Sequence, residues 1–351
     1  MADVLVVGAG IVGASVAYAA ARRGARVTLV ERSAPGSGVT RDSFAWIGAS
    51  GVPDGPVADL RRSATREYRR LEGELPGVRV RWTGSLSWGG PWTPPGEDQR
   101  EVGAAEVAAL EPQLREPPRR ALHLPGDGAV DPVAVTDALV AGAQELGAEL
   151  RVGTVVRALR LADGRVTGVE TSTGPLDASA VVLAAGVGVP ALCAPLGVHV
   201  PVAPSPAVLL RFAAAGTVVR TLVATPDVEV RQAADGTLLA TVEHAGETTP
   251  GQLAMTADRV AARLDAMFHG AQDLRLTGAA VGLRPVPADG EPLVGPVPGV
   301  AGLHLAVLHS GVSLAAAVGR LAALQVVDGD EVPELLGCRP GRALRPGRPP
   351  E

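Results

Sequence analysis

The sequence contains no lysine and no asparagine, and only two isoleucines, among its 351 residues. All of its fixed positive charge is therefore carried by arginine. A Schiff-base mechanism and a P-loop phosphate site each need a lysine, so this chain can have neither. Codon bias is enough to explain the missing residue types, and we use their absence only to limit the possible chemistry.

Cysteine is nearly absent as well. The two cysteines, Cys193 and Cys338, are far apart in the sequence, and no group of Cys and His has metal-ligand spacing. We therefore expect no metal and no structural disulfide, which suits a reducing, cytoplasmic location. No basic segment precedes the first apolar run, so the N-terminus does not resemble a signal peptide.

Charge and hydropathy indicate a soluble globular protein of two domains. The net charge is −5 with no long run of one sign, which argues against a nucleic-acid partner. Residues 178–198 are uncharged and long enough to raise the question of a membrane span. Glycines and prolines interrupt this stretch, so we expect a buried strand followed by turns, and no membrane span.

The first 31 residues have the pattern of a complete βαβ unit. Residues 3–8 form a short apolar run that ends in glycine, as a buried parallel strand does. Residues 11–23 have helical spacing with arginines in the last turn, and Gly24 is a natural helix end. Residues 26–30 predict a second strand, which ends at Glu31.

Three glycines at the first turn of this unit have dinucleotide-binding spacing, in the order Gly8-x-Gly10-x-x-Gly13. They would allow a tight turn, a close approach to a pyrophosphate and close helix–strand packing, and Glu31 could bind a ribose. A glycine-rich turn without a ligand is the alternative. The cofactor-binding residues predicted here are Gly8, Gly10, Ile11, Val12, Gly13, Glu31 and Arg32.

The rest of the chain alternates between helical and strand patterns. Asp131 and Pro132 predict the cap and first position of one helix, and Asp163-Gly164 and Asp235-Gly236 predict hairpin turns. Residues 33–55 are expected to form a loop. The predicted helices are 56–75, 131–147, 256–269 and 313–326, and the predicted strands are 149–157, 165–171, 180–184, 273–281 and 303–308, with meandering strands over 205–245.

Four segments resemble the D-amino-acid oxidase superfamily of flavoproteins, which includes glycine oxidase, sarcosine oxidase and D-amino-acid dehydrogenase. The first is the N-terminal motif through Arg32, and the second is the Ser-Gly-Val-Thr-Arg-Asp-Ser run at 37–43 with Phe-Ala-Trp-Ile after it. The third joins Gly-Ala-Val-Asp-Pro at 128–132 to the strand that ends at Gly186. The fourth contains Gly-Leu-Arg-Pro at 282–285 and His-Ser-Gly-Val-Ser-Leu at 309–314.

This resemblance implies FAD as cofactor and removal of a hydride from a small amine or amino acid, giving an imine. It places Thr40, Ala45 and Trp46 near the flavin and Val156 at the adenine. Residues 307–313 would wrap the flavin ring, with a helix N-terminus directed at the charge of the reduced flavin. The further cofactor contacts implied are Gly186, Ser310, Gly311, Val312 and Ser313.

Arg284 is the expected substrate-binding residue, because the arginine of the Gly-Leu-Arg-Pro segment pairs with the substrate carboxylate in amino-acid oxidases of this family. A planar guanidinium can hold a carboxylate by two parallel bonds. An arginine in an ion pair between domains is the alternative. His309 would lie near the flavin ring without an assigned role, and we group it with Arg284 as catalytic.

Departures from the family pattern qualify this resemblance. No cysteine stands at the family's flavin-attachment point, so the FAD is expected to be noncovalent. The lysine that sarcosine-type oxidases use toward oxygen is absent, which leaves oxygen and a redox partner as possible electron acceptors. His244 could line the pocket or belong to a surface loop, and Trp82, Trp88 and Trp92 could roof the site or belong to the second domain's core.

We therefore expect an α/β fold in which a Rossmann-type FAD-binding domain is interleaved with a smaller α+β substrate domain containing an antiparallel sheet. Oxidation of a hydroxy acid, which needs His309 or His244 as base, and a nucleotide-binding protein without activity are the two alternatives. The expected FAD-binding segments are 1–55, 120–200 and 282–336, the substrate domain is 56–119 and 201–281, and 337–351 is a mobile tail.

Overall fold

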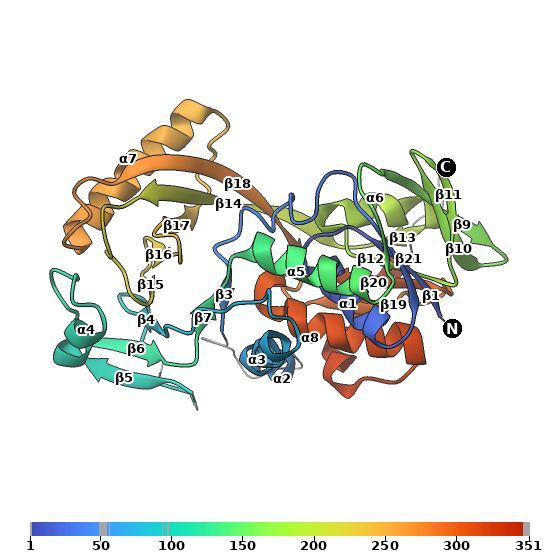
Figure 1. Ribbon diagram of the computed structural model, residues 1–351, viewed down its shortest axis with the longest axis horizontal. Helices are drawn as coiled ribbons and strands as arrows, with labels where there is room; N and C mark the ends of the chain where they lie inside the picture. The colour runs from blue at the N-terminus through green and yellow to red at the C-terminus, as the bar shows by residue number, and fades with distance from the viewer. Residues whose placement is uncertain (1, 49–54, 56, 93, 97, 347–351) are drawn as a thin grey trace.

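The computed structural model describes residues 2–48, 55, 57–92, 94–96 and 98–346. Two large sheets organise the chain (Figure 1). A six-stranded sheet lies on one side, and an eight-stranded sheet with two long arching strands, β14 and β18, lies on the other. The chain passes from the first sheet to the second and back twice, so each sheet is assembled from segments that are distant in sequence.

The six-stranded sheet has the order β19-β20-β12-β1-β2-β8, in which β19 is antiparallel to β20 and the other neighbours are parallel. It follows from short apolar runs that are buried on both faces. Its strands are β1 Asp3–Val7, β2 Arg26–Val30, β8 Glu149–Arg151, β12 Ala180–Leu183, β19 Leu293–Pro296 and β20 Leu303–Val307.

Side chains of this sheet alternate between two hydrophobic layers. Val4 and Val6 of β1 face a core built with helices, whereas Leu5 and Val7 face a small antiparallel sheet. The helices on the first face include α1 Ile11–Arg22, α3 Ala64–Glu74, α5 Pro132–Glu145 and α8 Gly311–Ala323, and the small sheet consists of β9 Val156–Ala162, β10 Arg165–Thr171 and β11 Gly174–Asp177.

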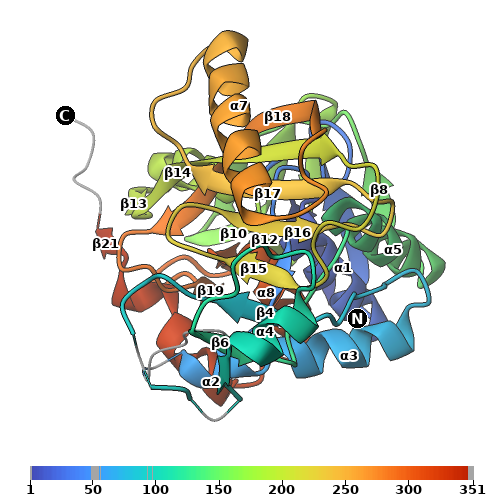
Figure 2. The same cartoon turned by 90° about the vertical axis from the view of Figure 1, so that its left-hand side faces the viewer.

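The eight-stranded sheet has the order β18-β14-β17-β16-β15-β4-β6-β5. One face packs against α7 (Pro250–Met267), which lies on the near side of the sheet in Figure 2. Its opposite face is directed toward the six-stranded sheet. The strands are β4 Ser85–Ser87, β5 Arg100–Gly103, β6 Arg120–Leu124, β14 Val202–Ala213, β15 Leu222–Ala224, β16 Glu229–Gln232, β17 Leu238–Glu243 and β18 Arg275–Pro287.

Shorter elements connect these layers. They are β3 Trp46–Ile47 paired with β7 Gly128–Ala129, α2 Ala58–Arg62, α4 Ala104–Leu110, α6 Val189–Cys193 between short 3-10 turns, and β13 Val198–His199 paired with β21 Arg345–Pro346.

Side-chain caps explain where helices α5 and α7 begin. The Asp131 carboxylate accepts hydrogen bonds from the amides of Val133 and Ala134, as the sequence predicts. Helix α7 begins six residues before the predicted start at 256, because Thr249 and Gln252 form a capping box. Helix α8 begins two residues earlier than predicted, with Ser310 as its N-cap.

The predicted strand over 149–157 is wrong, since the structure divides it into β8 and β9. Gly153 lies between the two with φ +65°, a left-handed conformation that ends an extended strand. The predicted turn at Asp163 and Gly164 is confirmed, with φ values of 48° and 74°. Strand β18 extends across the expected segment boundary at 282, and β6, which lies within the expected FAD-binding segment 120–200, belongs to the eight-stranded sheet.

Two apolar features near the C-terminus belong to the packed fold. Residues 311–328 are long and apolar enough to span a membrane by composition alone, but more than half of this stretch is buried and α8 packs against α1. The segment expected to form a mobile tail, 337–351, begins within the short turn Pro333–Cys338, and it contains Cys338, which is fully buried, and the short turn Pro340–Arg342.

Candidate functional site

The turn between β1 and α1 can be made only by glycines. Gly8 has φ +100°, and a Cβ there would lie 2.7 Å from the carbonyl oxygen of Ala184 on the next strand. A Cβ at Gly13 would lie 1.9 Å from the carbonyl oxygen of Gly8. Both glycines therefore do what the motif predicts, allowing a left-handed turn and close contact of helix and strand.

The N-terminus of α1 presents backbone amides without a side-chain cap. Gly10 is the N-cap residue and contributes no side-chain hydrogen bond. The amide of Ile11 donates to the hydroxyl of Thr40 at 3.2 Å. This bond joins the first and second of the four segments that resemble the family. The following amides of Val12 and Gly13 belong to the first helical turn, where an anion is stabilised. This arrangement fits the pyrophosphate of FAD.

Glu31 lies at the carboxyl end of β2, beside this turn. Its carboxylate accepts hydrogen bonds from the amides of Ala9 at 2.8 Å and Ser33 at 2.9 Å. Each oxygen retains acceptor capacity for a ribose hydroxyl. Its carbonyl accepts from the amide of Thr154, which brings the start of β9 at Val156 close to Glu31, while Arg32 is exposed.

Helix α8 brings a second N-terminus to the first. A Cβ at Gly311 would lie 3.5 Å from the Val12 side chain of α1, so the two helix starts are in van der Waals reach. The Ser313 hydroxyl donates to the carbonyl of Trp46, and the buried Tyr68 hydroxyl donates to the carbonyl of Val312 at 2.6 Å. Residues predicted to wrap the flavin are thus fixed by contacts from three distant segments.

Trp46 is held by an aspartate that the sequence analysis did not identify. The indole Nε1 of Trp46 donates to Asp127 Oδ2 at 2.8 Å, and the Ser85 hydroxyl donates to the same oxygen at 2.7 Å. Asp127 is almost fully buried and stands directly before the third segment. Ala45, next to Trp46, has φ +60° and is also buried. In the sequence, Asp127 stands between two glycines, and this pattern predicts only a turn.

Gly186, just beyond the end of β12, is the last of the predicted cofactor contacts on the six-stranded sheet. A Cβ there would lie 3.9 Å from the ring of Pro285 on β18, so the strand that contains Arg284 passes beside the flavin-binding segments. Gly282 confirms this approach, since a Cβ there would lie 3.0 Å from the carbonyl oxygen of Asp42. The third and fourth segments therefore meet.

Arg284 is positioned by one residue of the neighbouring strand. Its Nε donates to the Ser205 carbonyl at 3.2 Å, and its Nη2 donates to the Ser205 hydroxyl at 2.8 Å. No described residue accepts a bond from Nη1 or forms an ion pair with Arg284. Ser205 thus fixes one edge of the guanidinium and leaves the Nη1–Nη2 end available for a planar anion.

A second charged side chain, Glu229 of β16, lies on the same sheet face as Arg284. Strand pairing places Glu229 opposite Thr241, and Thr241 opposite Leu209, while Ser205 lies four residues before Leu209 and opposite Arg284. Because side chains alternate along a strand, all of these point to one face. Desolvation raises the pKa of Glu229, and the charge of Arg284 opposes this rise. The sequence analysis did not identify Glu229, because only strand pairing places it on the same sheet face as Arg284.

His309 stands where β20 passes into α8. Burial lowers its pKa to about 4, and the positive charges of Arg284 and Arg61 act in the same direction. His309 is therefore neutral near pH 7. Its electrostatic coupling to Arg284 places it at the junction between the six-stranded sheet and the face that contains Arg284 and Glu229.

Arg231 is a structural counterpart of Arg284 on the same face. Its Nε donates to the Phe44 carbonyl at 2.6 Å and its Nη2 to the Val130 carbonyl at 3.0 Å, and only 5% of the residue is exposed. Burial lowers its pKa to about 10. Arg231 therefore ties the eight-stranded sheet to the segments around Trp46.

The remaining candidates lie in packed or surface positions. His244 Nε2 lies 2.9 Å from the carbonyl oxygen of Glu247, within its own loop. Trp82 bonds Glu72 and packs against the core of the six-stranded sheet, Trp88 packs against the core of the eight-stranded sheet, and Trp92 is 36% exposed. Only Trp88 matches the expected position in the second domain's core.

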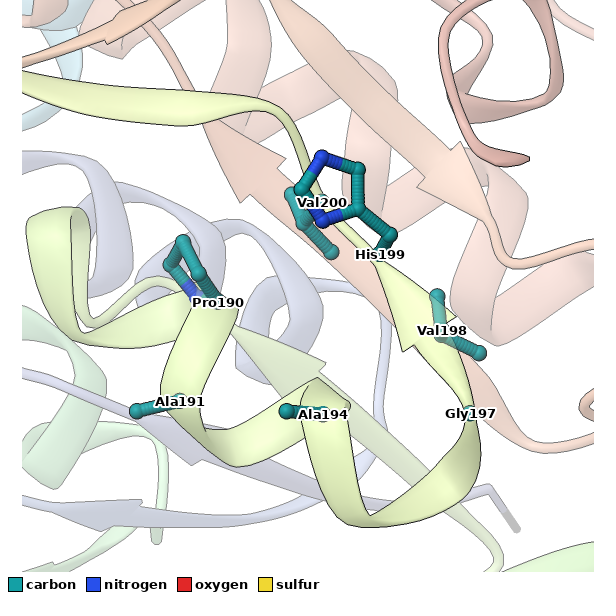
Figure 3. A pocket seen from close by; sticks show the side chains of 7 residues that line it. All are labelled: Pro190, Ala191, Ala194, Gly197, Val198, His199 and Val200. Carbon is teal, nitrogen blue, oxygen red and sulfur yellow. The ribbon is translucent and has the colours of Figure 1, made fainter. Parts of the chain in front are cut away.

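A surface pocket at α6 and β13 is separate from this arrangement (Figure 3). No predicted site residue lines it, and His199 is its one titratable side chain. Its other lining residues are Pro190, Ala191, Ala194, Gly197, Val198 and Val200. It has no pair of groups for acid–base or redox chemistry.

Comparison with known proteins identifies the same family over nearly the whole chain. The family described as FAD dependent oxidoreductase (DAO) matches residues 3–325. Glycine oxidase from Pseudomonas aeruginosa is 30% identical over 91% of this chain and 93% of its own length. A D-amino acid dehydrogenase from Cereibacter sphaeroides is 36% identical over 68% of this chain, which spans only 58% of that protein.

Solved structures agree on the fold. Glycine oxidase from Geobacillus kaustophilus has a TM-score of 0.84 and 22% identity, with 96% of this chain and 98% of that chain covered. Iminodiacetate oxidase from Chelativorans sp. BNC1 has a TM-score of 0.82 and 27% identity over the same shares of the two chains. The fold class, the cofactor and the enzyme class predicted from the sequence are confirmed. The chain belongs to the DAO family of FAD-dependent oxidoreductases.

Proposed function

We propose that this enzyme oxidises a small amino acid whose carboxylate is bound by Arg284. The observation that carries the proposal is the geometry of that side chain. Ser205 fixes the Nε–Nη2 edge of Arg284, and its strand β18 lies beside Gly186 and strand β20, which leads into α8. A carboxylate held by two parallel bonds on the free end would be oriented toward the flavin-binding segments.

The side chains and backbone of this chain would perform the binding and orientation. FAD, when bound, supplies the oxidation by taking two electrons from the substrate carbon. The pyrophosphate would rest on the amides of Val12 and Gly13, and Glu31 would bind the ribose. The uncapped N-terminus of α8 at Ser310 and Gly311 would stabilise negative charge on the reduced ring.

The relatives narrow the substrate. Two of them are named glycine oxidase and D-amino acid dehydrogenase, so we propose glycine or a D-amino acid as the substrate. Both names fit a small zwitterion held by one arginine. Either oxygen or a redox partner would take the electrons in the second half of the reaction.

A hydroxy acid is the second candidate, and the state of His309 favours it as the alternative. With a pKa of about 4, His309 is neutral near pH 7 and could accept a hydroxyl proton. His244 is a weaker candidate base, since its ring is engaged with Glu247.

The direct experiment measures anaerobic bleaching of the flavin in the purified protein by a matched panel of candidate substrates. The panel pairs each amino acid with its decarboxylated amine and with the corresponding hydroxy acid. We expect bleaching by glycine or a D-amino acid, and little by amines without a carboxylate. Equal bleaching by amino acids and amines would contradict the role of Arg284, and bleaching by hydroxy acids alone would favour the second candidate.

We further propose that the FAD is noncovalent and that the protein works in the cytoplasm. No cysteine occurs near the start of the fourth segment, and the two cysteines that exist are free and buried. Acid precipitation followed by absorbance of the supernatant tests the first proposal, and cell fractionation tests the second. Flavin that stays with the denatured chain would contradict noncovalent binding.

A further inference from the structure

Glu229 is an acidic residue that has no role in the binding of the substrate carboxylate by Arg284 proposed above. It lies on a central strand, on the face that carries Arg284, and no described residue donates a hydrogen bond to its carboxylate. Glu229 is half-buried, and a partly desolvated acidic group without a partner is unfavourable unless a ligand or a proton satisfies it. Arg284 influences it electrostatically, but the described residues show no direct ion pair between the two.

Arg284 and Glu229 share one sheet face, and Arg284 acts on Glu229 electrostatically without an ion pair. Two such opposite charges match the charges of a zwitterion. An α-amino acid has a carboxylate and an ammonium group on adjacent atoms, so it can lie between an arginine and a glutamate with both charges paired. The amine must also lose a proton before its carbon can be oxidised, because only a neutral nitrogen can offer its lone pair to a forming C=N bond. The chain has no lysine to accept this proton.

We propose that Glu229 binds the ammonium group of the amino-acid substrate and accepts one of its protons, an inference that rests on the proposed function. One N–H bond of the ammonium breaks and one O–H bond forms on the Glu229 carboxylate. The positive charge of the nitrogen and the negative charge of Glu229 disappear together, and the electron pair of the broken N–H bond remains on the nitrogen as its lone pair. Arg284 meanwhile holds the carboxylate.

The surroundings of Glu229 suit a proton acceptor. The charged side chains that strand pairing places on the same sheet face are Arg284 of β18, Arg231 on its own strand, Glu243 at the end of β17 and Arg211 of β14. Arg211 donates to the carbonyl of Arg41, and His309 is coupled electrostatically to Arg284. Arg231 is engaged with two carbonyls, Glu243 is exposed, and His309 is neutral near pH 7. Burial raises the pKa of Glu229, which makes it a stronger base than a solvated carboxylate.

The kinetic test is the pH profile of anaerobic flavin reduction in wild type, Glu229→Gln and the control Glu101→Gln. Glu101 is an exposed carboxylate on the edge strand β5 of the same sheet. We expect Glu229→Gln to lower kcat/KM for an amino acid roughly 100-fold near pH 7. The rate should recover at high pH, where the amine is already neutral in solution, and the control should follow wild type. A loss that is the same at every pH, or no loss, would overturn the proposal.

A binding test provides a readout apart from turnover. Glycine betaine and 3,3-dimethylbutanoate have the same shape, but only betaine carries a positive charge. Perturbation of the flavin spectrum should show wild type binding betaine about tenfold more tightly, and Glu229→Gln should lose this preference. An unchanged preference would contradict a cation-facing Glu229.

The two proposals can fail separately. If no amino acid bleaches the wild-type flavin, the proposed function fails, while the betaine comparison still tests Glu229. If amino acids bleach Glu229→Gln as they bleach wild type at every pH, this inference fails and the proposed function stands.

Discussion

The two halves of the candidate site use different chemical groups: one half is the flavin-binding side, and the other is a face of the eight-stranded sheet. The flavin-binding side uses backbone: glycines that exclude a Cβ, two helix N-termini, and one carboxylate that holds two amides. The sheet face uses side chains: Arg284 of β18, and Glu229 and Arg231 of β16. A site made of backbone depends on local sequence, whereas a site made of side chains depends on strand pairing.

The largest expected effect tests the backbone side. Gly13→Ala should destabilise the protein by about 4 kcal/mol and abolish FAD binding, because its Cβ would fall inside the Gly8 carbonyl. Urea unfolding and the ratio of flavin to protein absorbance measure both effects. Gly216→Ala, where a Cβ meets nothing within 4 Å, is the control and should change neither. A Gly13→Ala protein with normal flavin content would contradict the account of the turn.

Arg231 tests whether the two sides are joined by a buried side chain. Arg231→Ala should lower the free energy of unfolding by about 3 kcal/mol, because the carbonyls of Phe44 and Val130 lose their donors. Arg275→Ala, at the exposed start of β18, is the matched control and should have little effect. Equal unfolding curves for the two variants would show that Arg231 does not stabilise the junction.

Glu31 separates cofactor binding from folding. Glu31→Ala should weaken FAD binding by about 2 kcal/mol, since a charged acceptor is lost from the ribose and from the Ala9 and Ser33 amides. The apoprotein should remain folded. Flavin titration of the apoprotein measures the change, with Glu145→Ala, an exposed glutamate in α5, as the control. Unchanged affinity would remove Glu31 from the site.

The smallest effect concerns the pH dependence of stability. The pKa of His309 is lowered from 6.5 to about 4, so between these values the unfolded chain binds a proton that the native state does not. Stability should therefore fall as the pH falls from 6.5 to 4, with His309 contributing at most about 2 kcal/mol at pH 5. His309→Gln should make this part of the profile less steep, whereas His199→Gln, at an exposed position of β13, should not. A profile that His309→Gln leaves unchanged would show that His309 is not desolvated.

Sequence reasoning was most successful where residues act near their neighbours in the chain. The turn at Gly8, the cap at Asp131 and the hairpin at Asp163 each depend on a few consecutive residues, and all three are confirmed. The division of 149–157 into two strands was missed, because one glycine with positive φ decides it.

The candidate site shows the same limit. Arg284 was found through its family-like segment, but its partner Ser205 lies 79 residues away and joins it only by strand pairing. Asp127 and Glu229 were missed because nothing near them in the sequence marks them as more than turn or strand residues. Their roles depend on the hydrogen bond between Trp46 and Asp127 and on the electrostatic effect of Arg284 on Glu229, both of which folding creates.

The most direct test of the central claim, that Arg284 binds the substrate carboxylate beside the flavin, compares Arg284→Ala and Arg284→Lys with wild type. The measurement is kcat/KM for anaerobic flavin reduction by an amino acid and by the same amine without its carboxylate. We expect Arg284→Ala to lose about 3 kcal/mol of transition-state stabilisation for the amino acid. Arg284→Lys should recover part of this loss, and the amine rates and flavin content should hardly change. Equal losses for the amino acid and the amine, or no loss for either, would contradict the claim.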